Sequence, residues 1–188
     1  MSILDGMFND EKQIRQTSEY AQNVIKEILP HLGDDIRDVL EATKDGSSLA
    51  DVFGIDKEHL AALLDLGCSL LQAGETQKGI DVLVRLNQLD PLDERAYYAL
   101  GVACQTRGEL HKAAHFYLQF LALDATNPMG YLRLGECLLA AREFPEALSA
   151  LSVAKSLAED GKGEPGHLEE AERMLAIPEL AAAKAVRH

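Results

Sequence analysis

Hydrophobic and small residues recur along this chain with a period of 34 residues. Each period contains a leucine followed by a glycine, and a bulky apolar residue lies four positions before that glycine. The leucine–glycine pairs are Leu66-Gly67, Leu100-Gly101 and Leu134-Gly135, and the bulky residues are Leu63, Tyr97 and Tyr131. A pattern that repeats at this length predicts structural units that stack one on another.

A second set of small residues follows each glycine by twelve positions, at Gly79, Ala113 and Ala147. Small side chains allow two helices of one unit to cross at about the usual 8–10 Å. The offsets resemble those of the tetratricopeptide repeat, in which each unit is a helix–turn–helix hairpin. We therefore predict an all-α tetratricopeptide-repeat solenoid of three helical hairpins, in residues 60–93, 94–127 and 128–161, with N-terminal helices and a C-terminal capping helix.

Residues 1–59 precede the repeats and are predicted to form an N-terminal helical arm. Apolar residues recur at three- and four-residue spacing within residues 8–29, which predicts an amphipathic helix that ends at Pro30. A second short helix is expected over Asp34–Thr43. An unpartnered apolar stripe usually marks an interaction surface, so we expect this arm to form a homodimer or to fold back on the solenoid.

Residues 162–188 follow the repeats and are predicted to close the open edge of the third one. The glycine-rich stretch Gly161–Gly166 interrupts the pattern, and a helix is expected over His167–Ala176. Leu168, Ala171, Met174 and Leu175 lie on one face of that helix and would cover the third repeat, because solenoids need a capping element. The remaining tail is expected to fray.

The charge and composition narrow the range of partners. The formal net charge is −13, so a nucleic acid is not an expected partner, because phosphate binding needs a basic face. No apolar stretch reaches the roughly 20 residues that span a bilayer, and no signal peptide is apparent, so we expect no direct membrane insertion and a cytoplasmic location. Three cysteines without paired spacing agree with a reducing compartment; Cys104 and Cys137 are expected in the core.

Candidate chemistry is sparse in this sequence. His111 and His115 have the four-residue spacing of metal ligands on a helix, but nothing in the sequence places a third ligand beside them. No phosphate-binding loop, nucleophile elbow or dinucleotide fingerprint occurs. We therefore predict a binding protein with no catalytic residue, no metal and no cofactor.

The concave face of the solenoid is the predicted binding site. Repeat geometry directs positions 2, 5, 9 and 12 of each first helix into the concavity, and these positions are mostly apolar. We expect Leu64, Leu71, Tyr98 and Val102 to form pockets and Arg95 and Gln105 to bond the main chain of a ligand. The predicted peptide-binding residues are Leu64, Cys68, Leu71, Arg95, Tyr98, Val102, Gln105, Met129, Leu132, Glu136 and Leu139.

Two alternatives concern what this face meets. Its residues could pack on the terminal helix or on a dimer partner instead of a ligand, because an apolar face must be covered by something. Repeat co-chaperones that hold acidic peptide tails need lysine and asparagine at positions 5 and 9 of the first repeat. Leu64 and Cys68 occupy these positions here, which argues against an acidic tail as the ligand.

Two segments give the chain a more specific resemblance. Asp45–Ile55 leads into the first repeat, and Gly135–Leu139 followed by Phe144–Ala147 lies in the third. With the three repeats, they resemble the class II chaperones of bacterial type III secretion, which hold hydrophobic translocator proteins before export. The resemblance covers roughly residues 45–160 and implies a cytosolic chaperone in a bacterium. It also implies that the groove receives an extended translocator segment of the form Pro-x-Leu-x-x-Pro.

The function predicted from these observations is sequestration without ATP. The groove would hold aggregation-prone translocator segments until the export machinery takes them. The alternative is a general tetratricopeptide-repeat scaffold or assembly adaptor that binds another extended peptide in the same groove.

Overall fold

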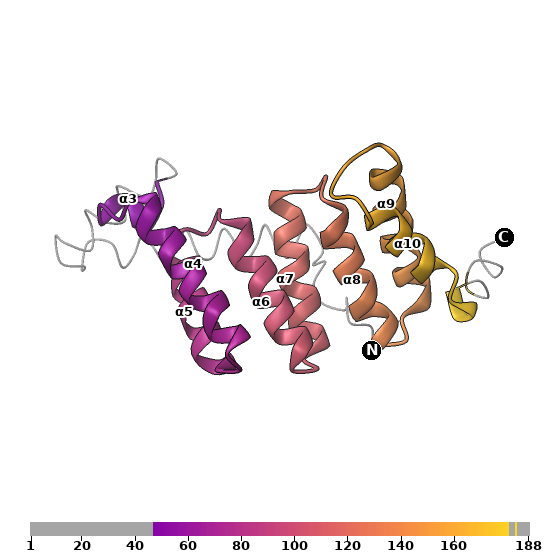
Figure 1. Ribbon diagram of the computed structural model, residues 1–188, viewed down its shortest axis with the longest axis horizontal. Helices are drawn as coiled ribbons and strands as arrows, with labels where there is room; N and C mark the ends of the chain where they lie inside the picture. Colours follow the sequence, from indigo (N-terminus) through magenta and orange to yellow (C-terminus); the bar gives the residue numbers. More distant parts are fainter. Residues whose placement is uncertain (1–46, 181–182, 184–188) are drawn as a thin grey trace, which may run out of the picture.

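The computed structural model describes residues 47–180 and residue 183 of the chain, and it has a helical solenoid architecture. Three helical hairpins stand side by side, and a short helix follows at the C-terminal end (Figure 1). No strand occurs in residues 47–180, so the predicted all-α repeat fold is confirmed. The helices are α3 (Leu49–Val52), α4 (Lys57–Gln72), α5 (Thr76–Leu89), α6 (Glu94–Thr106), α7 (Leu110–Leu123), α8 (Pro128–Ala140), α9 (Phe144–Glu159) and α10 (His167–Leu175).

The first helix of each hairpin begins at a capping side chain. Asp56, Asp93 and Asn127 precede α4, α6 and α8, and the side-chain oxygen of each accepts a hydrogen bond from a backbone N–H in the first turn. These bonds satisfy donors that a helix N-terminus leaves without an intrahelical partner. The caps therefore fix where the three first helices begin, and the starts of α6 and α8 line the groove described below.

Within each hairpin, the repeated glycine of the first helix lies directly beneath a large side chain of the second. A Cβ atom at Gly101 would lie 2.5 Å from Cε1 of Tyr117, and one at Gly135 would lie 2.5 Å from Cδ2 of Leu151. Gly67 stands in the same relation to Leu83, which also packs with Ala99 and Leu100 of the next repeat. The 34-residue period therefore reflects a close contact inside each hairpin as well as contact between hairpins.

The capping helix packs on the third repeat as its apolar face predicts. Ala171 and Met174 are buried in the same core cluster as Leu151 and Ala154 of α9. An ion pair of 3.0 Å between Lys155 Nζ and Glu172 Oε1 also joins α9 to α10. The helix therefore covers the edge that the last repeat would otherwise leave open.

The N-terminal arm is described only in its last part. The expected helices over residues 8–29 and 34–43 lie outside the described residues. The described part begins with the short helix α3, which Ser48 and Asp51 cap reciprocally. None of the described helices is both long enough and apolar enough to cross a bilayer.

Candidate functional site

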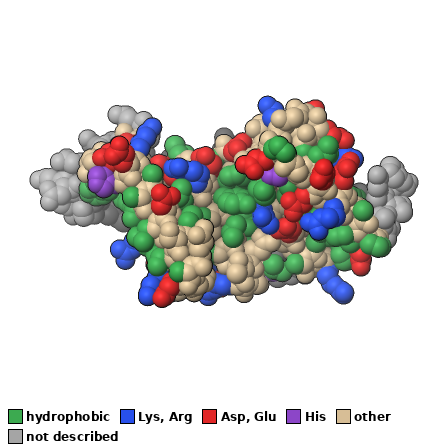
Figure 2. All heavy atoms as spheres, viewed as in Figure 1, with side chains coloured by type: hydrophobic (Ala, Val, Ile, Leu, Met, Phe, Trp, Pro, Cys, Tyr) green, Lys and Arg blue, Asp and Glu red, His purple; other side chains and the backbone are tan. Residues whose placement is uncertain are grey.

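A groove of about 470 Å³ opens between the first repeat, the second repeat and the C-terminal loop. We call this feature the groove. Its walls come from α4, α6, the end of α7, the start of α8 and the loop that precedes α10. Figure 2 shows hydrophobic side chains in the hollow at the middle of this face, with acidic side chains beside it. The groove residues are Leu64, Cys68, Glu94, Arg95, Tyr98, Ala99, Phe120, Asp124, Asn127, Met129, Gly163, Glu164 and His167.

The groove brings together five of the residues that the sequence nominates. These are Leu64, Cys68, Arg95, Tyr98 and Met129, which come from the first helices of all three repeats. Arg95, Tyr98 and Met129 lie in the N-terminal halves of α6 and α8, whereas Leu64 and Cys68 lie at the middle and in the C-terminal half of α4. The groove therefore uses only part of the predicted concave face.

Aromatic rings form the apolar wall of the groove. The ring of Tyr98 packs against Phe120 with centroids 5.5 Å apart and an interplanar angle of 58°. A second tilted contact joins Tyr98 to Tyr117 at 6.0 Å. Tilted pairs at these distances are favourable and hold the rings in place. The sequence does not nominate Phe120, because its repeat position belongs to the second helix and not to the concave positions of the first.

Arg95 is held by the capping residue of its own helix. The carboxylate of Asp93 is buried and accepts hydrogen bonds from Arg95 Nε (2.9 Å) and Nη2 (2.8 Å). These hydrogen bonds to Asp93 raise the pKa of the Arg95 guanidinium. Its charge is thereby paired, and the expectation that Arg95 also bonds the main chain of a ligand stays a prediction.

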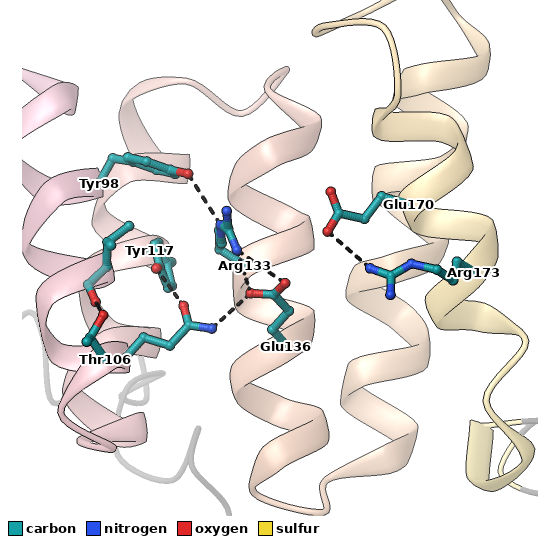
Figure 3. Close-up of polar contacts among 9 residues, drawn as sticks. Tyr98, Thr106, Tyr117, Arg133, Glu136, Glu170 and Arg173 are labelled. Atoms are coloured by element: carbon teal, nitrogen blue, oxygen red, sulfur yellow. Dashed lines mark hydrogen bonds and ion pairs between the residues drawn. The ribbon is translucent and has the colours of Figure 1, made fainter.

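Beyond the aromatic wall, a chain of hydrogen bonds joins α6, α7 and α8. Tyr117 Oη donates to Gln105 Oε1 (2.7 Å), and Gln105 Nε2 donates to Glu136 Oε2 (2.8 Å). Arg133 Nη1 lies 2.9 Å from the same Glu136 oxygen. Its Nε donates to Tyr98 Oη at 3.3 Å (Figure 3). The amide of Gln105 is thus engaged at both ends, and the expectation that it also bonds the main chain of a ligand stays a prediction.

Burial and hydrogen bonds shift the pKa values of Tyr117 and Arg133 in this network. Burial raises the pKa of the Tyr117 phenol well above its usual range. At Arg133, burial alone would lower the pKa, but the hydrogen bonds with Tyr98 and Glu136 outweigh it and raise the pKa. The phenol stays neutral and the guanidinium stays charged throughout the physiological range. The network therefore fixes the position of the Tyr98 ring.

The other nominated residues lie outside the groove. Leu132 is only 1% exposed and belongs to the core, so its nomination as a ligand-contacting residue is corrected here. Leu71 packs over Gly79, where a Cβ atom would lie 2.7 Å from Leu71 Cδ2. Val102 and Leu139 are half-buried against the main core cluster. Repeat position alone assigns these side chains to the concave face, but in the structure they pack between helices.

The loop before α10 supplies the groove wall that sequence reasoning missed. Gly163 and Glu164 reach the groove from the stretch that the sequence identifies only as a break between helices, and His167, the first residue of α10, joins them. The backbone N–H of Glu164 donates to Nδ1 of His167 (3.0 Å). His167 is buried, with 6% of its surface exposed. The glycine and proline content of Gly161–Gly166 indicates a loop, but nothing local shows where it packs.

The three cysteines are free thiols in different surroundings. Cys104 and Cys137 are buried, as the sequence predicts. Burial raises the pKa of the Cys137 thiol to about 12. Cys68 is half-buried in the groove wall, and burial, with a smaller contribution from Asp65, raises the pKa of its thiol. These thiols are therefore poorly ionised at neutral pH and unsuited to nucleophilic attack.

A second apolar surface lies at the N-terminal edge of the solenoid. Gly54, Ile55, His59, Ala62, Leu63 and Leu66 surround a shallow depression of about 520 Å³ on α4 and the turn before it. Phe53 and Leu66 are 62% and 49% exposed. We call this feature the α4 edge surface. An exposed apolar patch of this kind is typical of a surface that meets another protein segment.

Comparison with known sequences agrees with the repeat fold. Residues 64–128 match the family model described as tetratricopeptide repeat. The low calcium response locus protein H of Yersinia pestis is 31% identical over 117 residues, which is 62% of this chain and 70% of that protein.

Comparison with solved structures finds the same repeat fold in proteins of type III secretion. A type III secretion system complex from Aeromonas hydrophila contains a chain with a TM-score of 0.68 and 26% identity, covering 80% of this chain and 97% of that one. The Yersinia enterocolitica type III secretion chaperone SycD, crystallised with a peptide of the translocator YopD, matches with a TM-score of 0.60 and 28% identity. That match covers 71% of this chain and 98% of SycD.

Proposed function

Because this chain belongs to the translocator chaperones of bacterial type III secretion, we propose that its groove holds an extended segment of a hydrophobic translocator before export. The function is binding and sequestration in the bacterial cytoplasm, without ATP and without catalysis. The chaperone SycD, which shares the fold, was crystallised with a translocator peptide, and this supports the same kind of ligand here. The expected segment has the form Pro-x-Leu-x-x-Pro.

The observation that carries this proposal is an apolar groove on a rigid helical frame. Leu64, Tyr98, Phe120 and Met129 line it, and the Arg133–Glu136 network fixes the Tyr98 ring from behind. Burying one leucine-sized side chain contributes about 1.5–3 kcal/mol. Two or three such anchors give roughly micromolar affinity after the entropy costs of association, and an extended proline-containing segment loses little conformational freedom on binding.

Within this proposal the groove residues have different roles. Leu64, Tyr98, Phe120 and Met129 contact the apolar side chains of the segment, and Cys68 lies against it. Arg95, through its bond to Asp93, keeps the first turn of α6 in place. Gln105, Arg133 and Glu136 position the aromatic wall. Leu71, Val102, Leu132 and Leu139 support the frame from within the packed layers.

A second part of the proposal concerns self-association. We propose that residues 1–59 form an arm through which two copies of the chain associate, with residues 60–161 as the binding repeats and 162–188 as the cap. The α4 edge surface supports this division, because its apolar residues adjoin the arm and remain exposed within the described part of the chain.

The direct test of the groove is co-expression with a translocator from the same bacterium. The wild-type chain should keep the translocator soluble and co-purify with it. The double variant Leu64→Ala with Tyr98→Ala removes anchors from α4 and α6, and we expect it to lose at least about 3 kcal/mol of binding, more than a hundredfold in Kd. The measurement is the soluble translocator fraction, followed by the Kd for the isolated segment.

The matched control shortens two exposed apolar residues outside the groove, Val84→Ala on α5 with Val153→Ala on α9. This variant should bind as the wild type does. Circular dichroism must show that both variants keep their helical content. A folded Leu64/Tyr98 variant with undiminished binding would contradict the groove assignment and favour a different binding surface.

A further inference from the structure

The charged side chains around the groove are not balanced. Three carboxylates line it, those of Glu94, Asp124 and Glu164, against the single guanidinium of Arg95. Arg95 is already paired with Asp93 at 2.8 Å, outside the lining itself. The groove therefore has a net negative lining even though its floor is apolar.

Within the described part of the chain, none of these three carboxylates forms an ion pair. Asp124 uses both oxygens in its loop, accepting from Thr126 N and Oγ1 and from Asn127 Nδ2. By contrast, the carboxylates of Glu94 and Glu164 accept no hydrogen bond from the described residues. Glu94 lies at the start of α6 and Glu164 on the loop before α10, so they border the groove from different elements.

The apolar wall of the groove suits a long cationic side chain. Tyr98 and Phe120 pack together on this wall, and their ring faces attract a cation. A lysine or arginine can lay its methylene stem along such rings while its charged end stays near water and carboxylates. An acidic side chain at the same place would meet the negative lining without a free cation to pair with.

We propose that the groove selects an extended segment in which a lysine or arginine lies next to the apolar anchor, and that Glu94 and Glu164 are the specificity-determining residues. This inference rests on the proposed function, since it adds to the segment's apolar anchor the requirement for a positive charge beside it. Glu94 and Glu164 attract the cation from two sides, while Tyr98 and Phe120 contact its stem. The preference is electrostatic and partly exposed, so salt weakens it.

The test uses the full chain and a set of synthetic peptides of the form Pro-x-Leu-x-x-Pro. Each variable position in turn carries lysine, glutamine or glutamate, and the others carry alanine. Fluorescence anisotropy gives the Kd at about 50 mM and about 500 mM salt. At one position or more, we expect lysine to bind about fivefold more tightly than glutamine at low salt, and glutamate to bind more weakly still. At high salt the lysine preference should fall below about twofold.

The double variant Glu94→Gln with Glu164→Gln should bring the lysine peptide to the affinity of the glutamine peptide, which should itself change little. The matched control, Asp81→Asn with Glu179→Gln, removes two exposed carboxylates outside the groove and should keep the preference. Equal binding of lysine and glutamine peptides at every position, or a preference that survives in the Glu94/Glu164 variant, would overturn the inference and leave the proposed function standing. If no peptide of the set binds, the groove proposal and the inference fail together.

Discussion

Gly101 lies beneath the ring of Tyr117, and this contact allows a sharp test of the packing. Helix propensity favours alanine over glycine by about 1 kcal/mol in a helix interior. A Cβ atom at this site, however, would lie 2.5 Å from Cε1 and 2.8 Å from Cδ1 of a fully buried ring. We expect Gly101→Ala to lower the free energy of unfolding by about 1–3 kcal/mol, because overpacking outweighs propensity.

Urea unfolding followed by circular dichroism measures this change. The sign of the effect is decisive, since propensity and packing predict opposite directions. A variant as stable as the wild type, or more stable, would show that the hairpin can relax around the added methyl group and that the glycine period has another cause.

At the residue scale, the sequence predicts contacts that depend on local spacing and misses those that depend on how helices are rotated. The glycines at positions 67, 101 and 135 are identifiable because every hairpin needs the same close approach. Arg133 cannot be identified in this way, because it lies one position after the nominated Leu132. Only the observed rotation of α8 directs its side chain towards Tyr98 and Glu136. The same rotation buries Leu132, which repeat position alone assigns to the concavity.

At the scale of elements, the 34-residue period predicts where the repeat helices begin. Asp93 and Asn127 lie directly before α6 and α8, which begin where the second and third repeats are expected. The start of α10 at His167 also agrees with the sequence. The loop before it is different, since its contribution to the groove depends on where α10 packs. No local pattern in a loop encodes that tertiary contact.

The proposed role of the N-terminal arm belongs to this scale. A chain that begins at Ser47 keeps α3 to α10 but lacks the amphipathic segment 8–29. We expect the full chain to sediment as a dimer and the shortened chain as a monomer, because removal of the apolar stripe removes the contact that two copies share. Sedimentation velocity over a range of concentrations measures the change.

Circular dichroism serves as the control for folding of the shortened chain. A shortened chain that remains dimeric would assign the contact to the described residues, with the α4 edge surface as the first candidate. A full chain that is monomeric at all concentrations would contradict the self-association proposal altogether.

At the scale of the whole molecule, three similar hairpins produce one groove because the ends of the solenoid differ. The first repeat contributes Leu64 and Cys68, the second contributes Tyr98, and the C-terminal loop closes the far side with Glu164 and His167. The repeat pattern predicts a concave binding face, and the resemblance to secretion chaperones predicts its ligand class. The loop before the cap adds Glu164 to the carboxylates of Glu94 and Asp124 around the groove, and sequence spacing does not reveal that contact.

The central claim is that a translocator segment lies in this groove, and Cys68 reports on it directly. Its thiol lines the groove and is half-buried, whereas Cys104 and Cys137 are buried in the core. At mildly alkaline pH, where more of this thiol with a raised pKa is ionised, the rate of Cys68 alkylation by iodoacetamide is followed by mass spectrometry. The rate should fall at least about tenfold when the segment saturates the chain, because a ligand in contact excludes the reagent. An unchanged rate at saturation would place the segment elsewhere on the molecule and contradict the account.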